Sequence, residues 1–310
     1  MRHKSGSSNK RIISKVIGQI QKFLAPKDPN RFDFTVDHLL RAGKNISRLA
    51  NIKGQLLSSE ILNNKKSDTV FILGSGPSIN EISDSQWSHI SEFDSIGFNF
   101  WAAHDLVPNF YALQLFNNYA NRIQFKLFID KMKEYQSVTF LVRGSWLTRE
   151  EVDGSFLNFF RDEQVYYVNE YAIHSECSIE PQKLIDYFDT LGFLEQGIIQ
   201  PCMPKIYSTV SSLMNLCFVM GYQNIVLCGI DMTSPSHFWD NGKYKRVKDK
   251  YRLLDESRSN VMMLNDKENK KFTVPEVIYA QADYYKRKNG VDVYIANRNT
   301  VLYPHIKLYF

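Results

Sequence analysis

A short turn that follows an apolar strand is the first segment whose residue types could do chemistry. Residues 69–73 read TVFIL, and the turn that follows is Gly74-Ser75-Gly76-Pro77-Ser78. Glycines after a strand let backbone N–H groups come close to a phosphate. The turn therefore predicts a nucleotide or another phosphate ligand at the carboxyl end of this strand.

The turn matches neither of the two common nucleotide fingerprints. A dinucleotide fold needs G-x-G-x-x-G, and the sixth position here is Ile79. A P-loop needs G-K-[ST] after its glycines, and this chain has no such sequence there. The segment thus disfavours NAD, FAD and Walker-type ATP sites while leaving a nucleotide open.

In a second segment, polar residues precede an apolar helix and follow the strand that comes after it. Ser208 and Thr209 precede an apolar helix that ends near Met220, and a strand over 224–228 leads to Gly229-Ile230-Asp231. A hydroxyl at a helix start is ordinarily an N-cap. Ligands of open parallel sheets bind beyond the carboxyl ends of the strands, so residues 229–231 are expected at such a site. Asp231 could serve as a base there or cap a turn.

His237 is the histidine expected beside this site. It lies in Ser236-His237-Phe238-Trp239-Asp240, within a polar segment over 233–272 that has the length of a functional lid. Histidine suits proton removal near neutral pH, although it could equally bind phosphate or only pack. The other six are expected elsewhere, with His89, His104 and His174 in or near surface loops.

The alternation of strands and helices predicts an α/β fold: a doubly wound, mostly parallel, Rossmann-like sheet. We expect a basic, helical N-terminal extension over 1–66, the nucleotide-sugar-binding domain over 67–232, the lid over 233–272, and a helix and strand over 273–310 that complete the domain. The expected strands are 69–73, 95–100, 110–115, 137–142, 164–167, 224–228 and 291–295, and the expected helices are 79–92, 119–134, 180–191, 208–221 and 275–289.

The charge of the chain is concentrated at one end. Residues 1–27 contain seven Lys and Arg and no acid, whereas the net charge of all 310 residues is +5, so the body is slightly acidic. This argues against a nucleic-acid footprint. Residues 11–25 place apolar residues on one helical face, which suits an anionic membrane surface or packing on the domain. We expect no transmembrane span, no disulfide among the four cysteines, and a cytoplasmic protein on the inner membrane face.

Taken together, the two segments resemble the bacterial lipooligosaccharide sialyltransferases, glycosyltransferase family 42, and are similar to the Kdo transferases of lipopolysaccharide cores. The family turn G-N-G-P-S corresponds to Gly74–Ser78, and its hydroxyl pair, G-Y and G-I-D correspond to Ser208-Thr209, Gly221-Tyr222 and Gly229-Ile230-Asp231, with matching spacing. The resemblance covers residues 68–302 in patches and implies a single-domain GT-A-like variant. It implies that the residues that bind nucleotide and donor are Gly74, Ser75, Gly76, Pro77, Ser78, Asn99, Gln114, Ser208, Thr209, Gly229, Ile230 and Asp231.

The resemblance implies transfer of a nonulosonate sugar, sialic acid or Kdo, from a CMP-activated donor to a glycan such as lipooligosaccharide, lipopolysaccharide or capsule. CMP has one phosphate and the chain has no D-x-D motif, so no metal or other cofactor is expected. Thr273 stands where the family has its base histidine and Ser75 replaces the turn asparagine, which leaves His237 as the expected base. A pterin pyrophosphokinase-like enzyme with the same turn, a non-catalytic nucleotide-binding module and a homo-oligomer all remain open.

Overall fold

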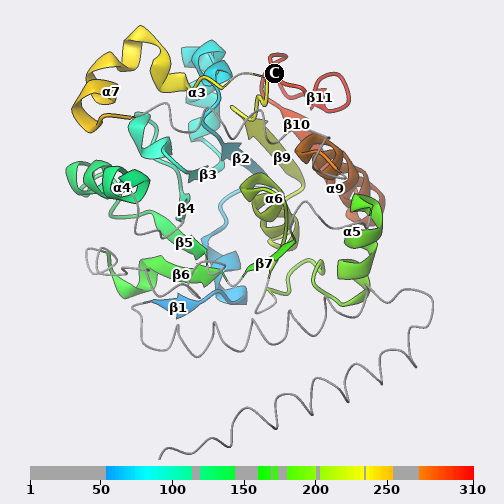
Figure 1. The fold of residues 1–310 in the computed structure, drawn as a ribbon. Helices are drawn as coiled ribbons and strands as arrows, with labels where there is room; N and C mark the ends of the chain where they lie inside the picture. Colours follow the sequence, from blue (N-terminus) through cyan, green and yellow to red (C-terminus); the bar gives the residue numbers. More distant parts are fainter. Residues whose placement is uncertain are drawn as a thin grey trace, which may run out of the picture.

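The computed structural model describes residues 54–113, 119–143, 160–168, 170–173, 180–199, 203–233, 235–253 and 272–310. In this part of the chain one parallel sheet has the strand order β1-β6-β5-β4-β3-β2-β9-β10-β11 (Figure 1). Its strands are β1 (Gln55–Leu56), β2 (Thr69–Leu73), β3 (Asp94–Phe98), β4 (Phe110–Leu113), β5 (Thr139–Arg143), β6 (Val165–Val168), β9 (Asn224–Cys228), β10 (Asp292–Ile295) and β11 (Lys307–Leu308). A second, two-stranded parallel sheet pairs β7 (Glu170–Ile173) with β8 (Met203–Ile206).

Helices cover both faces of the main sheet, as Figure 1 shows. One face packs against α5 (Pro181–Thr190), α6 (Thr209–Val219) and α9 (Val274–Asn289). The other face lies under α3 (Asp84–Ser91), α4 (Tyr119–Asp130) and α7 (Lys245–Tyr251). Strand β2 is buried along its whole length, with Val70 and Ile72 on the first face and Phe71 and Leu73 on the second. This explains why its sequence is continuously apolar.

The strand order changes direction between β2 and β9. From β2 the chain proceeds outward through β3, β4, β5 and β6, and it later returns to pair β9 with the opposite side of β2, followed by β10. Such a reversal defines a doubly wound sheet, and ligands of such sheets bind at the reversal, outside the carboxyl ends of the strands. The expected fold class is therefore confirmed.

Local signals explain where the elements near the site begin and end. Thr273 caps α9 in a capping box with Glu276, with the Thr273 backbone N–H donating to Glu276 Oε2 at 2.7 Å. Gly290 ends the same helix in the left-handed conformation, at φ 72°. Thr273, which carries no imidazole, therefore has a helix-capping role.

Short elements account for most differences from the sequence expectations. Strand β1 and the 3₁₀ helix η1 (Ser59–Asn64) lie in the segment assigned to the extension, yet β1 pairs with β6 in the main sheet. Strands β7, β8 and β11 were not expected, and the segment 79–92 divides into η2 (Pro77–Glu81) and α3. The described part of the lid contains η7 (Phe238–Asp240), η8 (Gly242–Tyr244) and α7.

Other expectations concern residues that the structure does not describe or describes in part. The basic helix over 11–25, Gln114, His3, His38, His174, Cys177 and Cys202 lie outside the described residues, as do Ser234 and 254–271 of the lid. In the described part, Cys217 and Cys228 are buried free thiols. None of the described helices combines the length and the apolar character needed to cross a bilayer.

Candidate functional site

Two loops meet at the reversal between β2 and β9, and we call them the turn pair: residues 74–78 and 229–231. The backbone N–H of Gly74 donates to the carbonyl oxygen of Cys228 at 2.8 Å, and that of Gly76 donates to Gly229 at 2.8 Å. The two motifs singled out from the sequence are thus joined by main-chain hydrogen bonds. They lie at the edge where this fold class binds ligands.

The glycines of the turn pair allow this close contact. A Cβ at Gly74 would lie 2.5 Å from the Gly229 carbonyl oxygen, and a Cβ at Gly76 would lie 2.5 Å from Asp231 Cγ. Gly229 has φ +63°, and a Cβ there would lie 2.6 Å from Ile79 Cγ1. Side chains at these three positions are therefore excluded by packing, and at Gly229 the backbone conformation disfavours them as well.

Asp231 binds the first loop through both carboxylate oxygens. The Ser78 backbone N–H donates to Oδ2 at 2.8 Å, and the Ser78 hydroxyl donates to Oδ1. Burial raises the pKa of Asp231 to about 6, although the two hydrogen bonds from Ser78 act in the opposite direction. This carboxylate acts as a cap for η2, which is the structural alternative that the sequence left open.

The internal hydrogen bonds limit how the turn can meet a ligand. The N–H groups of Gly74, Gly76 and Ser78 all donate within the protein, and Pro77 has none. A ligand on this loop would therefore meet half-buried Ser75 and the surface of the turn rather than a ring of free N–H groups. The turn pair is therefore better suited to line one side of a binding site than to bind a phosphate through its backbone N–H groups.

Asn99 lies next to the turn pair in the sheet, directly after β3, the neighbour of β2. It is exposed and has φ 53°, while its carbonyl oxygen accepts hydrogen bonds from the Tyr111 hydroxyl and the Gln124 amide. Left-handed residues other than glycine are uncommon and gather at functional sites. The backbone is thus fixed, and the amide side chain stands at the carboxyl edge.

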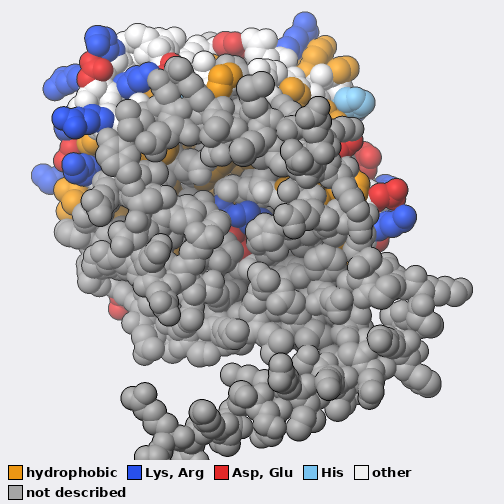
Figure 2. All heavy atoms as spheres, in the orientation of Figure 1, with side chains coloured by type: hydrophobic (Ala, Val, Ile, Leu, Met, Phe, Trp, Pro, Cys, Tyr) orange, Lys and Arg blue, Asp and Glu red, His pale blue; other side chains and the backbone are white. Residues whose placement is uncertain are grey.

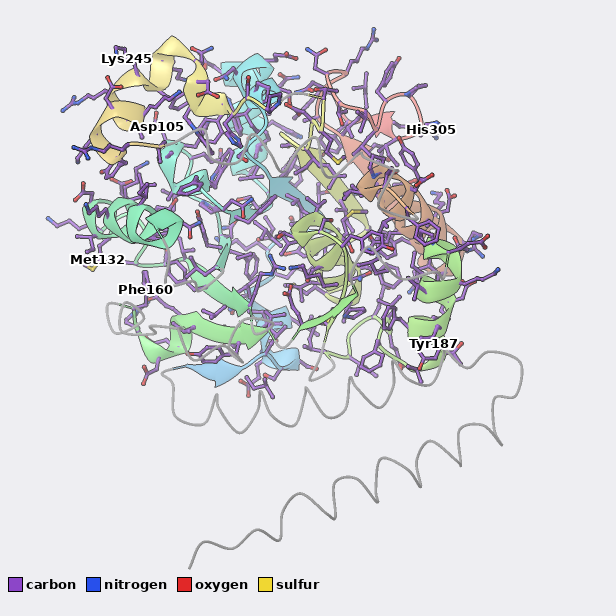
Figure 3. The ribbon with its side chains drawn as sticks, viewed as in Figure 1. Asp105, Met132, Phe160, Tyr187, Lys245 and His305 are labelled. Carbon is purple, nitrogen blue, oxygen red and sulfur yellow. The ribbon has the colours of Figure 1, made fainter. Side chains whose placement is uncertain are left out.

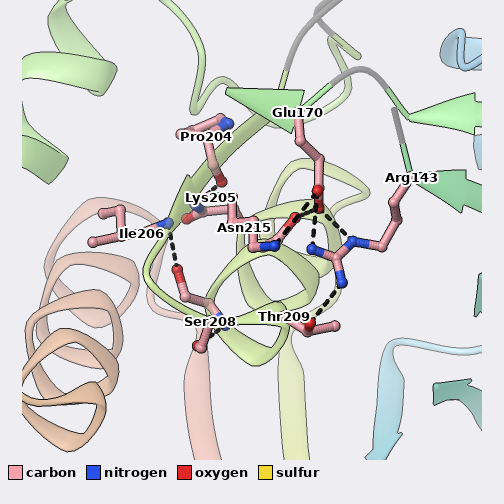
Figure 4. Close-up of polar contacts among 10 residues, drawn as sticks. Arg143, Glu170, Pro204, Lys205, Ile206, Ser208, Thr209 and Asn215 are labelled. Atoms are coloured by element: carbon pink, nitrogen blue, oxygen red, sulfur yellow. Dashed lines mark hydrogen bonds and ion pairs between the residues drawn. The ribbon is translucent and has the colours of Figure 1, made fainter. Parts of the chain in front are cut away.

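Thr209 belongs to a charged cluster at the same edge (Figure 4). The other members of the cluster were missed by sequence reasoning: Arg143, Glu170, Lys205 and Ser212. Arg143 ends β5, and its guanidinium binds Glu170 through two hydrogen bonds, Nε to Oε1 at 2.6 Å and Nη2 to Oε2 at 2.9 Å. Nη1 of Arg143 donates to Thr209 Oγ1 at 2.6 Å. This hydrogen bond positions the Thr209 side chain. Ser208 instead caps α6, because its hydroxyl oxygen accepts from the Ser211 N–H at 3.1 Å.

The cluster has unusual electrostatics because it is buried. Burial alone would raise the pKa of Glu170, but the charges of Arg143 and Lys205 and the hydrogen bonds from Arg143 and Ser212 hold the pKa below its usual value. Burial lowers the pKa of Lys205 to about 8, and repulsion from Arg143 adds to this effect. The cluster contains two basic side chains, Arg143 and Lys205, around the single carboxylate of Glu170. Figure 2 shows basic and acidic side chains close together near the middle of the face in view.

His237 begins η7, which packs on the turn pair. The Phe238 N–H donates to the Ser75 carbonyl oxygen at 3.0 Å, so the lid backbone touches the glycine turn directly. His237 is 9% exposed, and its ring stacks on that of Trp239 with ring centroids 4.2 Å apart. The structure thus brings His237 to the turn pair, as expected, within an aromatic setting.

The other described histidines lie in different surroundings. The expectation of a surface loop is wrong for His104, which is 5% exposed and stacks on Trp101 with centroids 4.4 Å apart. Burial, together with the charges of Lys243 and Lys131, lowers the pKa of His104 to about 3, so it is neutral. His305 is exposed and lies at the edge of the molecule opposite Asp105 and Lys245 (Figure 3).

The remaining candidates are placed as follows. Ile230 is buried in the core, and its carbonyl oxygen accepts from the Thr300 hydroxyl at 2.7 Å, which ties the second loop to the segment after β10. In the described ranges, no group of three His, Cys, Asp or Glu side chains is arranged to hold a metal ion.

Comparison with known proteins found no matching family model and no matching curated protein sequence. Among solved structures, the chain is similar to the sialyltransferase CST-II in complex with a trisaccharide acceptor and CMP, at 17% identity and a TM-score of 0.42, covering 77% of this chain and 85% of that one. It is also similar to CstII from Campylobacter jejuni with cytidine-5'-monophosphate, at 17% identity and a TM-score of 0.40, covering 77% and 84%. The MAf glycosyltransferase from Magnetospirillum magneticum AMB-1 matches at 14% identity and a TM-score of 0.46, covering 87% of this chain and 37% of that one.

Two of these three structures are of sialyltransferases, the class of enzyme that the sequence motifs resemble. At these TM-scores the similarities carry no functional conclusion for this chain.

Proposed function

We propose that this protein is a glycosyltransferase that transfers a nonulosonate sugar, of the sialic acid or Kdo type, from a CMP-activated donor to a glycan. One observation supports this most: the turn pair, exposed Asn99 and the Arg143–Thr209 pair all lie at the carboxyl edge of a doubly wound sheet. That edge offers a surface for a nucleotide and, beside it, a cationic environment for an anion.

The chemistry of the donor fits such a pairing of surfaces. A CMP-nonulosonate carries one phosphate and one carboxylate on the carbon that is attacked. Transfer passes through an oxocarbenium-like state, so the leaving phosphate needs stabilisation by donors and cations. Thr209 supplies a hydroxyl at the start of α6, and the buried guanidinium of Arg143, at the end of β5, lies directly behind it. We propose that the leaving phosphate or the carboxylate binds there, and that the nucleotide lies against the turn pair and Asn99.

The decisive experiment is donor hydrolysis. The purified full chain should release CMP from CMP-sialic acid or CMP-Kdo, and it should do so equally well with EDTA. Release of AMP from ATP with a pterin acceptor would instead support a pyrophosphokinase. Turnover of none of these compounds would favour a non-catalytic module, and loss of activity in EDTA that magnesium restores would contradict the metal-free mechanism.

His237 is the proposed general base for the acceptor hydroxyl. Its segment contacts the glycine turn, and a positioned base contributes roughly 100- to 10,000-fold to the rate. His237→Ala should therefore lose turnover while CMP affinity stays within about threefold, whereas a phosphate-binding role would reduce affinity as well. His305→Ala, at an exposed histidine between β10 and β11, is the matched control. Turnover of His237→Ala close to that of the control would remove it from the mechanism.

We propose that the acceptor is a cell-surface glycan such as lipooligosaccharide, lipopolysaccharide or capsule, and that residues 1–27 hold the protein on the inner membrane face. The seven basic residues of this arm support the idea, because each contributes about 1 kcal/mol near an anionic surface. Deleting the arm should abolish binding to vesicles that contain anionic lipid and leave donor hydrolysis intact. Equal vesicle binding by the shortened chain would refute the anchor.

A further inference from the structure

The charged cluster joins three segments that are distant in the sequence. Arg143 ends β5, Glu170 begins β7, and Thr209 and Ser212 lie in the first turn and a half of α6. Glu170 Oε1 accepts from Arg143 Nε and from the Ser212 hydroxyl, both at 2.6 Å, so the carboxylate is fixed from two sides (Figure 4). The exposed fractions of the Arg143 and Glu170 side chains are 2% and 0%. The pair is therefore shielded from water, and its geometry is strongly restrained.

The direction of each hydrogen bond in this cluster is determined by chemistry. A guanidinium has only donors, so Arg143 donates to Thr209, and the Thr209 oxygen must accept. The hydroxyl proton of Thr209 is then directed away from Arg143 and is available to another acceptor. An Arg143 that is held by two bonds to Glu170 thus positions the Thr209 oxygen and leaves its hydroxyl proton to be donated on the other side.

The neighbouring hydroxyl has a different task. Ser208 is the N-cap of α6, and its oxygen accepts from the Ser211 backbone N–H. Thr209 is half-buried and stands at the first helical position, where its side chain is not needed for the cap. Of the hydroxyl pair, Thr209 is therefore the one oriented by charged neighbours and partly open to a ligand.

We infer that Glu170 is a positioning residue that acts through Arg143, so that the Thr209 hydroxyl donates to an anionic oxygen of the sugar-nucleotide donor. The inference rests on the proposed function and adds to it residues on β5 and β7 that lie outside the sequence motifs. A purely structural Glu170 would affect stability alone. A positioning Glu170 affects donor binding, and it does so only while Thr209 has its hydroxyl.

A double-mutant cycle tests this, with the KM for hydrolysis of CMP-sialic acid and the Kd for CMP as readouts. Thr209→Val should raise the donor KM about 10- to 100-fold, because a hydrogen bond to a charged group is lost, and Thr209→Ser should restore most of it. Glu170→Gln should raise KM about tenfold alone and by less than about twofold in the Thr209→Val background. Arg143→Lys keeps the positive charge but cannot make two parallel hydrogen bonds to Glu170, so its effect on the KM should match that of Glu170→Gln. This variant takes the place of Glu170→Gln in the cycle if Glu170→Gln does not fold.

The matched control is Tyr285→Phe, which removes a buried hydroxyl that donates to Asn215 on the same helix α6 at 2.7 Å. It should lower stability and leave the KM within about twofold, which separates a change in the helix from a change at Thr209. The inference would be overturned if the effects of Glu170→Gln and Thr209→Val on the KM were additive, or if Thr209→Val left the KM unchanged. In either case the proposed function would still stand as long as the wild type turns over the donor. Absence of CMP binding and turnover by the wild type would overturn both.

Discussion

The turn pair and the charged cluster lie at the same edge of the sheet but are built in different ways. The turn pair is held by main-chain hydrogen bonds between two short, contiguous sequences, and its glycines are needed because the loops touch. The charged cluster is held by side chains from β5, β7, β8 and α6, of which Arg143 and Thr209 are 66 positions apart. The structure of the turn pair depends on the small size of its glycines, and the structure of the charged cluster depends on the pairing of opposite charges.

This difference separates two kinds of constraint on the site. In the turn pair, any side chain larger than hydrogen at Gly74, Gly76 or Gly229 would clash, whatever its chemistry. In the charged cluster, volume can be conserved while function is lost, because a buried cation and anion must balance. Substitutions that change only size or only charge should therefore act differently in the two regions.

Removing a buried charge should have the largest effect on stability. Arg143→Met keeps much of the side-chain volume but leaves Glu170 without its bidentate partner, and breaking a buried pair in this way costs about 3–5 kcal/mol. The exposed pair Lys286–Asp292, at 2.9 Å, provides the control, since Lys286→Met should cost less than about 1 kcal/mol. Urea denaturation measures both variants, and equal losses would mean that the cluster is not a buried ion pair in solution.

Adding a side chain to a glycine of the turn pair should have the second largest effect on stability. Gly229→Ala combines a left-handed backbone with a Cβ placed against Ile79 and should cost about 2–4 kcal/mol. Gly290 has a similar φ of +72° but nothing within 4 Å of an added Cβ, so Gly290→Ala should cost only about 1–2 kcal/mol. The difference between the two variants isolates the contact between loops. If they are equally destabilised in the same denaturation assay, the close packing of the turn pair is wrong.

The carboxylate of Asp231 in the turn pair should have a smaller effect on stability, and this effect should depend on pH. The pKa of Asp231 in the folded protein, about 6, lies above its usual value of 3.8. The stabilisation from its bound proton is therefore complete at low pH and is lost as pH rises through about 6. Relative to Asp231→Asn, the wild type should lose roughly 1 kcal/mol of unfolding free energy between about pH 5 and about pH 7. Parallel stability curves for the two proteins would show that burial does not raise this pKa.

The sequence revealed the turn pair because its signals are local. A buried parallel strand must be apolar on both faces, so β2 and β9 were predicted with the bounds that the structure has. The glycines and Asp231 follow these strands directly, and a ligand edge follows from the fold class. The helix starting at Thr209 and the one ending at Asn289 were also close to prediction, because caps and periodicity define them.

The charged members of the cluster, unlike Thr209, escaped prediction because nothing local marks them. Arg143 ends an ordinary apolar strand, and its partner Glu170 lies 27 residues later in a short strand that periodicity does not reveal. Lys205 follows a proline in β8, where a strand is not expected. His104 was placed in a surface loop because its burial arises from contacts with distant aromatic rings, such as Phe238 with centroids 5.6 Å apart.

A crystal structure of the protein with CMP tests most directly whether the two regions form one site. The account predicts that cytidine and ribose lie against the turn pair and Asn99, and that the phosphate lies within hydrogen-bond distance of Thr209. The Ser78–Asp231 and Arg143–Glu170 contacts should stay in place, because both regions are already ordered by their own hydrogen bonds. CMP bound away from the carboxyl ends of β2 and β9, or no bound nucleotide at concentrations that saturate binding in solution, would contradict the account.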